Sequence, residues 1–181
     1  LALYSAKSDS EIDLLGRFSP SKFDFDAGVN RVEADNENTK TLSSFGAKIA
    51  RGKHSSNALM THGVSHFHTT SFQNYPTAHV NFKHAARSAD AVDEPAQEGD
   101  ILIARVGTRC LGRAVIVVSG KQQISDCVFR ISPPPSTRRK IWEFISSEAG
   151  RSWQLSLARG ACAKFITQQD LLSAPLPQGF R

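Results

Sequence analysis

The sequence predicts a mixed α+β domain, in which a β-meander with a hairpin core is followed by short helices. Two observations indicate this fold class. Three short apolar segments rich in β-branched residues follow one another between residues 101 and 131, separated by glycine turns. Two amphipathic segments with helical spacing come after them. The length of 181 residues corresponds to one domain rather than two.

The first half of the chain contains three weaker signals. Residues 40–45 predict a short helix after an acidic connector, and residues 47–53 predict a strand that ends in a basic turn at Gly52. Residues 54–63 are mostly polar, so we expect an exposed loop there.

A pattern with a period of two residues follows over residues 64–72. This pattern predicts a strand with His66 and His68 on one face, running into a turn near Pro76. The polar residues 88–98 predict a loop.

The central part of the chain carries the clearest strand signals. Residues 101–106, 113–118 and 127–131 are apolar and are joined by turns at residues 107–112 and 119–120. Consecutive apolar segments joined by short glycine-containing turns are typical of an antiparallel meander. We therefore expect these three strands to pair as neighbours.

The first helix is predicted over residues 137–149, with Ser136 as its N-cap and Gly150 as the residue that ends it. Its apolar stripe contains Ile141, Trp142, Phe144 and Ile145. If the ring of Trp142 lies in the core, truncating it to alanine should cost about 3–5 kcal/mol.

A second short helix is expected over residues 151–159, with Trp153 and Leu157 facing inward. Thr167 can cap a final helical turn over residues 168–172. Strands followed by helices give the α+β class.

Composition excludes several classes of protein. The chain is 40% hydrophobic and 22% charged, which is typical of a folded globular protein. Its longest uninterrupted apolar run covers residues 114–118, far less than the roughly 18 residues of a membrane helix, and residues 1–6 do not resemble a signal peptide. The three separated cysteines favour a reducing compartment, so we expect a cytoplasmic protein.

Charge is distributed unevenly along the chain. The net charge is +5, but residues 1–37 carry four basic and eight acidic side chains, whereas residues 101–169 carry eleven basic and three acidic ones. A local excess of this size attracts phosphate groups, which is the sequence-independent part of nucleic-acid binding. A solvated surface without a partner would give the same pattern.

Catalytic signals are absent from the sequence. A nuclease needs paired carboxylates to hold magnesium, and the basic segment contains only the scattered Asp126, Glu143 and Glu148. Neither a P-loop nor a dinucleotide-binding glycine pattern occurs. We therefore predict no catalytic residue and no cofactor.

The histidines suggest a metal site that we do not predict. His66 and His68 could supply two zinc ligands from one strand face, with His62 nearby. No third and fourth ligand is indicated beside them. A metal-dependent enzyme that uses these histidines stays open as the less favoured alternative.

A turn rich in arginine and glycine is the most distinctive feature. Arg105, Arg109 and Arg113 recur every four residues across a turn that also contains Thr108. A hairpin would gather these groups at one end of the sheet, an arrangement that suits contacts to phosphates and base edges.

Several segments together resemble the target recognition domains of type I restriction-modification specificity subunits and their fused methyltransferase relatives. The resemblance rests on the sequence RFSP at residues 17–20 with Phe23 and Phe25, GDILIARVG at 99–107, Gly112 with Arg113, and ITQQDLLSAPLP at 166–177. It covers nearly the whole chain.

The resemblance implies a non-catalytic α+β domain that reads one half of a split double-stranded DNA target. It implies as partners a DNA methyltransferase (modification) subunit or domain, with a restriction subunit as a further partner. It places a lead-in at residues 1–16, a single recognition domain at 17–177 and a tail at 178–181, without the long spacer helix that follows such domains in the family.

Two groups of side chains are predicted to contact DNA. Phosphate contacts are expected from residues 138–140 and from Arg51, Lys53, Arg109 and Arg113. Base readout is expected from His66, Thr69, Thr70, Arg105 and Thr108, because arginine reads guanine bidentately and threonine offers hydroxyl and methyl contacts. A protein-docking module whose basic face binds an acidic partner is the second alternative.

Overall fold

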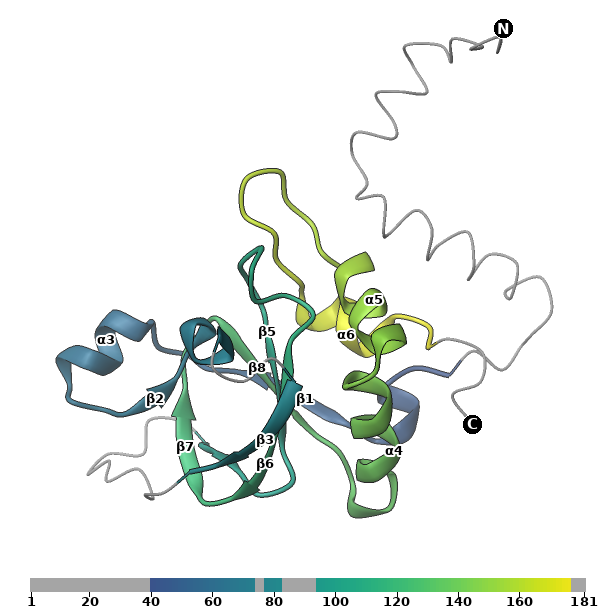
Figure 1. The fold of residues 1–181 in the computed structure, drawn as a ribbon, viewed down its shortest axis with the longest axis horizontal. Coiled ribbons are helices and arrows are strands. Elements are labelled where there is room, and N and C mark those ends of the chain that lie inside the picture. The colour runs from purple at the N-terminus through teal and green to yellow at the C-terminus, as the bar shows by residue number, and fades with distance from the viewer. Residues whose placement is uncertain (1–39, 74–76, 83–93, 177–181) are drawn as a thin grey trace, which may run out of the picture.

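The fold is taken from a computed structural model, which describes residues 40–73, 77–82 and 94–176 (Figure 1). Within these residues, a five-stranded sheet has the spatial order β1-β8-β5-β6-β3. Neighbouring strands are antiparallel except β3 and β6, which are parallel. Its strands are β1 (Lys48–Arg51), β8 (Val128–Ser132), β5 (Ile101–Ala104), β6 (Ala114–Ser119) and β3 (Thr77–Asn81).

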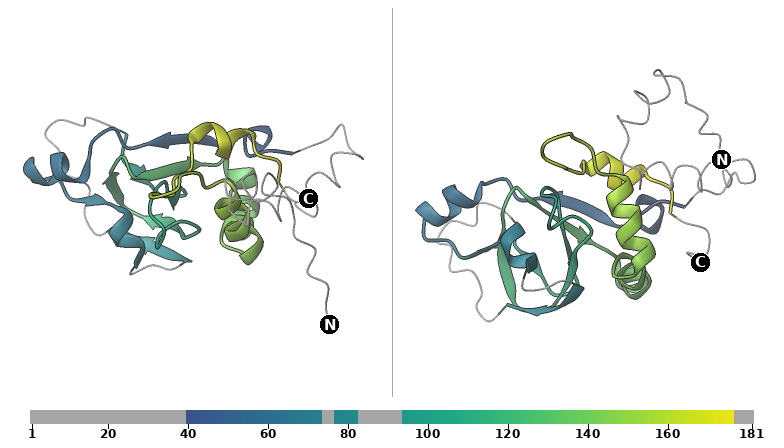
Figure 2. Two further views of the ribbon diagram at one scale, coloured as in Figure 1. Left: turned by 90° about the horizontal axis from the view of Figure 1, so that it is seen from above. Right: turned by 45° about the horizontal axis from the view of Figure 1, so that its top comes forward.

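A smaller sheet of three short strands lies beside the first. Its order is β2-β7-β4, with β2 parallel and β4 antiparallel to the central β7. Its strands are β2 (His66–Phe67), β7 (Lys121–Ile124) and β4 (Ala96–Gln97). Figure 2 shows the strands of the two sheets curving around a common interior.

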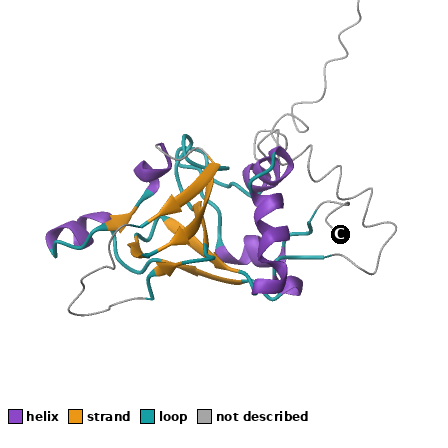
Figure 3. Ribbon diagram, turned by 60° about the horizontal axis from the view of Figure 1, so that its bottom comes forward, coloured by secondary structure: helices purple, strands orange, loops and turns teal. Residues whose placement is uncertain are grey.

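Helices occupy two separate places on the sheets. The helices α4, α5 and α6 gather on one side of the strands, whereas α3 projects at the other side (Figure 3). The helical elements are η1 (Ser43–Phe45), α3 (Ser56–Thr61), η2 (Thr69–Gln73), α4 (Pro135–Ile145), α5 (Glu148–Ser156) and α6 (Gln168–Ser173), where η denotes a 3₁₀ helix. None of the helices in the described ranges could cross a membrane.

Both faces of the larger sheet are buried at its central strand β5, and alternate residues of that strand belong to two different cores. In β5, Ile101 and Ile103 join a cluster beneath the helices, whereas Leu102 and Ala104 join a second cluster between the two sheets. The period of two residues along a strand explains this division. Burial on both sides also explains why β5 reads as a continuous apolar run.

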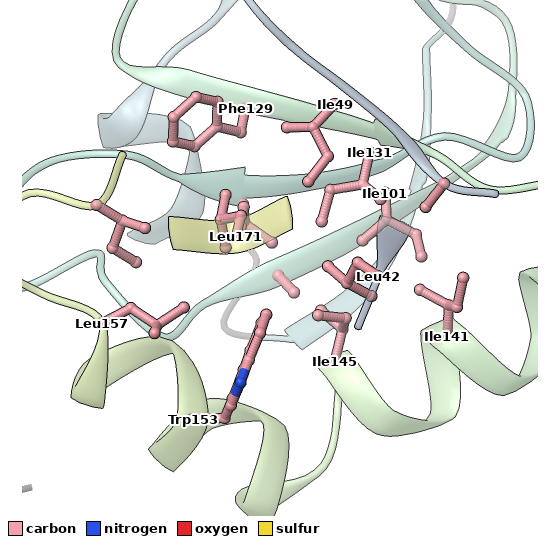
Figure 4. Close-up of a cluster of buried hydrophobic side chains, with 14 of the residues drawn as sticks. Leu42, Ile49, Ile101, Phe129, Ile131, Ile141, Ile145, Trp153, Leu157 and Leu171 are labelled. Carbon is pink, nitrogen blue, oxygen red and sulfur yellow. The ribbon is translucent and has the colours of Figure 1, made fainter. Parts of the chain in front are cut away.

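Trp153 belongs to the cluster beneath the helices, which we call the helical core. Its side chain is fully buried, its indole N–H donates to the carbonyl oxygen of Pro175 at 3.0 Å, and its ring packs edge-to-face on Phe144. Figure 4 shows it pointing from α5 toward the sheet. Trp142, predicted in the apolar stripe of the first helix, is only half-buried: it packs against the edge of this core and contacts the ring of His79.

The predicted strands are confirmed, but their meander order is not. β5 lies between β8 and β6, so the first of the three predicted strands is central. The difference arises because β7 intervenes after β6 and pairs in the smaller sheet instead. The prediction missed β7 because its sequence KQQI is mostly polar.

The helix boundaries differ from those predicted. α4 begins at Pro135, one residue before the predicted cap, and ends at Ile145. Gly150 does not end this helix: it lies inside α5, where a Cβ atom would come within 2.0 Å of the carbonyl oxygen of Phe144. α5 therefore starts early, with Ser147 as its N-cap. The predicted cap at Thr167 is confirmed.

The first half of the chain contains two corrections. The loop expected over residues 54–63 includes α3, whose N-cap Ser55 accepts a hydrogen bond from the amide of Ala58. The strand expected over residues 64–72 is limited to β2 and then turns into η2. The short helix near residue 45 and the strand near Ile49 are confirmed.

Some predictions fall outside the described residues. These are the lead-in at 1–16, the segment at 17–25 that contributes to the resemblance, Pro76 and the tail at 178–181. Of the predicted loop at 88–98, the described part contains β4.

Candidate nucleic-acid interface

One end of the larger sheet collects the predicted binding segments. The strand register places Arg51, at the end of β1, opposite Phe129 near the start of β8. It places Ala104, the last residue of β5, opposite Val128, and Ile103 opposite Ala114 at the start of β6. The segments that follow β1 and β5 and those that precede β8 and β6 therefore meet at the same end.

The turn over residues 107–112 is anchored in both cores and exposes its tip. Leu111 is buried in the helical core, and Cys110 is buried in the core between the sheets. The amides of Cys110 and Leu111 donate to the carbonyl oxygen of Gly107, at 3.1 and 3.0 Å respectively. Thr108 and Arg109 lie between Gly107 and Cys110 and are exposed. The tip thus projects at this end of the sheet from a turn that is held in place by both cores.

Two of the predicted arginines are half-buried and bonded to backbone carbonyls. The Nε of Arg105 donates to the carbonyl oxygen of Asp126 at 2.9 Å, and an Nη of Arg113 donates to that of Phe72 at 2.9 Å. Arg109 is exposed and forms no ion pair within the described ranges. The three arginines that recur in the sequence therefore have different environments.

The 3₁₀ helix η2 lies directly against this turn. The thiol of Cys110 donates to the carbonyl oxygen of Thr69 at 3.2 Å, across 41 residues of sequence. Thr69 is half-buried, and Thr70 is exposed beside it. Two of the predicted base-reading residues are thus brought to the turn over residues 107–112, which we call the arginine turn. They lie on a 3₁₀ helix rather than on the predicted strand.

Arg51 and Lys53 reach the same end through a close backbone approach. A Cβ atom on the intervening Gly52 would lie 2.2 Å from the carbonyl oxygen of Ile124. Next to it, the amide of Asp126 donates to the carbonyl oxygen of His54 at 2.9 Å. Both basic side chains are exposed at the edge of this junction.

His66 and His68 serve to join segments of the fold. The ring of His66 bonds to the hydroxyl of Ser56 at 2.7 Å and to the carbonyl oxygen of Val64 at 3.0 Å, through its two nitrogens. The Nδ1 of His68 lies 2.7 Å from the hydroxyl of Ser125. The prediction that His66 reads bases directly therefore receives no support from the geometry.

The same contacts bear on metal binding. The two histidine rings lie 6.2 Å apart, but both nitrogens of His66 already have protein partners. In the part of the chain that the structure describes, no three His, Cys, Asp or Glu side chains are grouped to hold an ion. Burial, together with the nearby His66, lowers the pKa of His68, and Asp126 partly opposes this. The lowered pKa favours the neutral form of His68.

The sequence-based prediction missed two basic residues at this end. The side chain of Arg151 on α5 lies across Gly112, since a Cβ atom on Gly112 would come within 2.8 Å of the Cγ of Arg151. The carbonyl oxygen of Lys164 accepts from the amide of Gly107 at 3.0 Å, so the segment around residues 159–165 lies beside the turn (Figure 1). Only local charge signalled these residues, because their contacts depend on the tertiary fold.

Residues 138–140 do not belong to this group. Arg138 packs against Gly99, which precedes β5, and Lys140 lies over the ring of Phe45 at 5.5 Å. Gly99 lies at the opposite end of β5 from Arg105. Residues 138–140 therefore lie away from the arginine turn, and their contact with phosphate groups stays a prediction.

Comparison with known proteins gives a structural likeness only. No family model matches the sequence, and no curated protein matches it. A chain from a study of complex assembly and conformational transition of the type I restriction-modification system shares the fold, with a TM-score of 0.53 and 15% identity. The match covers 93% of this chain and 43% of that one.

The chain has the fold of a type I restriction-modification protein. The resemblance inferred from the sequence is thereby confirmed for the fold. A specificity subunit of such a system from M. genitalium also matches, with a TM-score of 0.45, 13% identity and coverage of 76% of this chain and 34% of that one. The chain thus spans less than half the length of the restriction-modification chains that it matches.

Proposed function

We propose that this chain binds double-stranded DNA sequence-specifically and acts as the specificity part of a restriction-modification methyltransferase complex. One observation carries the proposal. Basic and hydrogen-bonding side chains from separate segments gather at one end of the sheet, in a fold shared with a type I restriction-modification chain. In this proposal residues 17–177 form the recognition unit and read one half of a split target.

The arrangement separates two kinds of DNA contact. Arg51, Lys53, Arg109 and Arg151 are exposed at this end of the sheet and Lys164 is half-buried there, and these cations are suited to phosphate groups. The tip of the turn and η2 present short polar side chains beside them, which can reach base edges in a groove. Phosphate contacts would fix the register of the chain on the duplex, and base contacts would supply specificity.

The proposed role includes no reaction at this surface. A methyltransferase subunit or domain would carry out the chemistry, and a restriction subunit is the further proposed partner. The chain would then supply the sequence preference of the whole complex, so its own activity would be measured as binding.

Selection from a randomised duplex library tests this function. The full chain is incubated with the library near physiological salt in the presence of a chelator, and the enriched sequence is then titrated with salt. We expect enrichment of a short motif of about 3–5 base pairs, and a slope of log K against log salt of about −0.9 for each phosphate contact.

Two results would contradict the proposal. Binding to all sequences alike, lost at modest salt, would indicate an electrostatic surface and favour the protein-docking alternative. Enrichment that requires added zinc would favour a role for the histidines. A variant with Arg51, Arg109 and Arg151 changed to glutamine serves as the matched negative control, since these side chains are exposed.

A further inference from the structure

We propose that Arg113 is a positioning residue, which fastens η2 to the turn at residues 107–112 so that the two segments read DNA as one unit. This inference rests on the proposed function. It gives Arg113 a role different from the phosphate contact predicted from the sequence.

Two side-chain bonds join the segments at both ends of η2. The guanidinium of Arg113 donates to the carbonyl oxygen of Phe72 at 2.9 Å, and the thiol of Cys110 donates to that of Thr69 at 3.2 Å. Cys110 lies in the turn and Arg113 directly follows it, and each acceptor lies 41 residues earlier in the chain than its donor. A shift of the turn would therefore move η2 with it.

One residue of each bond is buried, which restricts the motion of both segments. Phe72 is fully buried, and its ring packs edge-to-face on Phe67 at 4.9 Å between centroids. Cys110 is also buried in that core. The exposed Thr70 and Arg109 are thus presented from a shared base rather than from two independent loops.

The chemistry of a helix end explains why a guanidinium suits this place. The last carbonyl groups of a helix lack intrahelical donors and carry partial negative charge. Phe72 is the next-to-last residue of η2, and the cation of Arg113 meets its carbonyl group. Without this donor, the C-terminal end of η2 would lose its link to the start of β6.

The contrast with Arg109 makes the inference testable. Reading a base edge requires side chains held to within about 0.5 Å, whereas a phosphate contact tolerates a flexible cation. Arg109 is exposed, while Arg113 is half-buried and bonded to a carbonyl group. Removing Arg113 should therefore reduce discrimination between sequences, and removing Arg109 should reduce affinity for all of them.

The experiment compares Arg113→Met with Arg109→Met in the full chain. Each protein is tested by library selection and by salt titration on selected and random duplexes. For Arg113→Met we expect the ratio of affinities for selected and random DNA to fall at least about tenfold, with the salt slope unchanged. For Arg109→Met we expect the same motif and a slope smaller by about 0.9.

Two further variants guard against general loss of structure. Arg113→Lys retains a donor near the carbonyl oxygen of Phe72 and should recover most of the discrimination. Cys110→Ala removes the other bond and should reduce discrimination at the same base positions of the selected motif as Arg113→Met. These effects should appear in proteins whose far-UV circular dichroism matches that of the parent.

The possible failures are distinguishable. If the parent chain selects no motif, the proposed function itself fails. If the parent selects a motif and Arg113→Met selects it equally well with a smaller salt slope, Arg113 is a phosphate contact and the positioning role is wrong. If Cys110→Ala selects an unchanged motif, this would likewise count against the proposal that η2 and the turn read DNA as one unit.

Discussion

Gly52 passes so close to Ile124 that a Cβ atom on Gly52 would lie 2.2 Å from the carbonyl oxygen of Ile124. The next residue along, Ser125, has backbone atoms within 2.5 Å of the same position. Backbone atoms cannot move aside as a flexible side chain can. This approach fixes where the chain leaves β1 and therefore where Arg51 and Lys53 lie relative to the arginine turn.

Gly52→Ala should destabilise the protein and weaken DNA binding together. The added methyl group forces β1 away from the turn at residues 124–126, at a cost of about 1–3 kcal/mol for overpacking. Chemical denaturation measures this cost. Arg51→Ala is the matched control, because that side chain is exposed and its loss should change stability by less than about 0.5 kcal/mol. Equal stability of the two variants would show that the backbones are not in contact.

Trp153→Ala should be among the most destabilising single substitutions in the chain. It removes a fully buried ring and leaves the carbonyl oxygen of Pro175 without its donor, so we expect a loss of about 3–5 kcal/mol in the free energy of unfolding. Trp142→Ala should cost clearly less, because that ring is half-buried. Thermal melting of both variants decides the order, and a larger effect at Trp142 would contradict this description of the core.

The sequence predicted those elements whose signals are local. The apolar run of β5 and the Thr167 cap of α6 depend on neighbouring residues, and both were found where expected. The inward positions of Trp153 and Leu157 likewise followed from helical spacing and are confirmed. The early start of α5 involves instead the approach of Gly150 to the carbonyl group of Phe144. Such a contact between two helices leaves no periodic pattern in the sequence.

The candidate site was predictable as a set of residue types but not as an arrangement. The four-residue spacing of the arginines predicted that a hairpin gathers them at one end of the sheet, yet Arg105 and Arg113 bond to carbonyl groups that lie 21 and 41 residues away. The alternation over residues 64–72 likewise concealed η2, because its turn depends on the amide of Ser71 donating to the carbonyl oxygen of His68. Tertiary contacts therefore determined which predicted residues were left exposed.

His68 should make the stability of the protein depend on pH. Burial lowers its native pKa below the ordinary value of 6.5, so between these two values the unfolded chain binds more protons than the native one. The stability that neutral His68 contributes is fully present above about pH 6.5 and is lost as the pH falls toward the native pKa.

Denaturation at pH 7.5 and 5.5 measures this contribution. The parent chain should lose more free energy of unfolding over this interval than His68→Asn, which keeps a polar group near Ser125 but cannot titrate. The remaining histidines are common to both proteins. Equal losses in the two proteins would mean that the native pKa of His68 is not lowered.

Arg109→Glu should weaken DNA binding without unfolding the protein. Arg109 lies exposed at the tip of the anchored turn. Reversing its charge replaces an attraction to a phosphate group of about 1 kcal/mol with a repulsion of about 1 kcal/mol, for charges about 4 Å apart in water. The affinity for DNA should therefore fall about thirtyfold at low salt. Lys121→Glu is the matched control, since Lys121 is exposed at the far end of β7 from residues 124–126. A titration in which both variants bind like the parent would exclude the arginine turn as the DNA-binding surface, whereas equal weakening by both would indicate attraction by net charge alone.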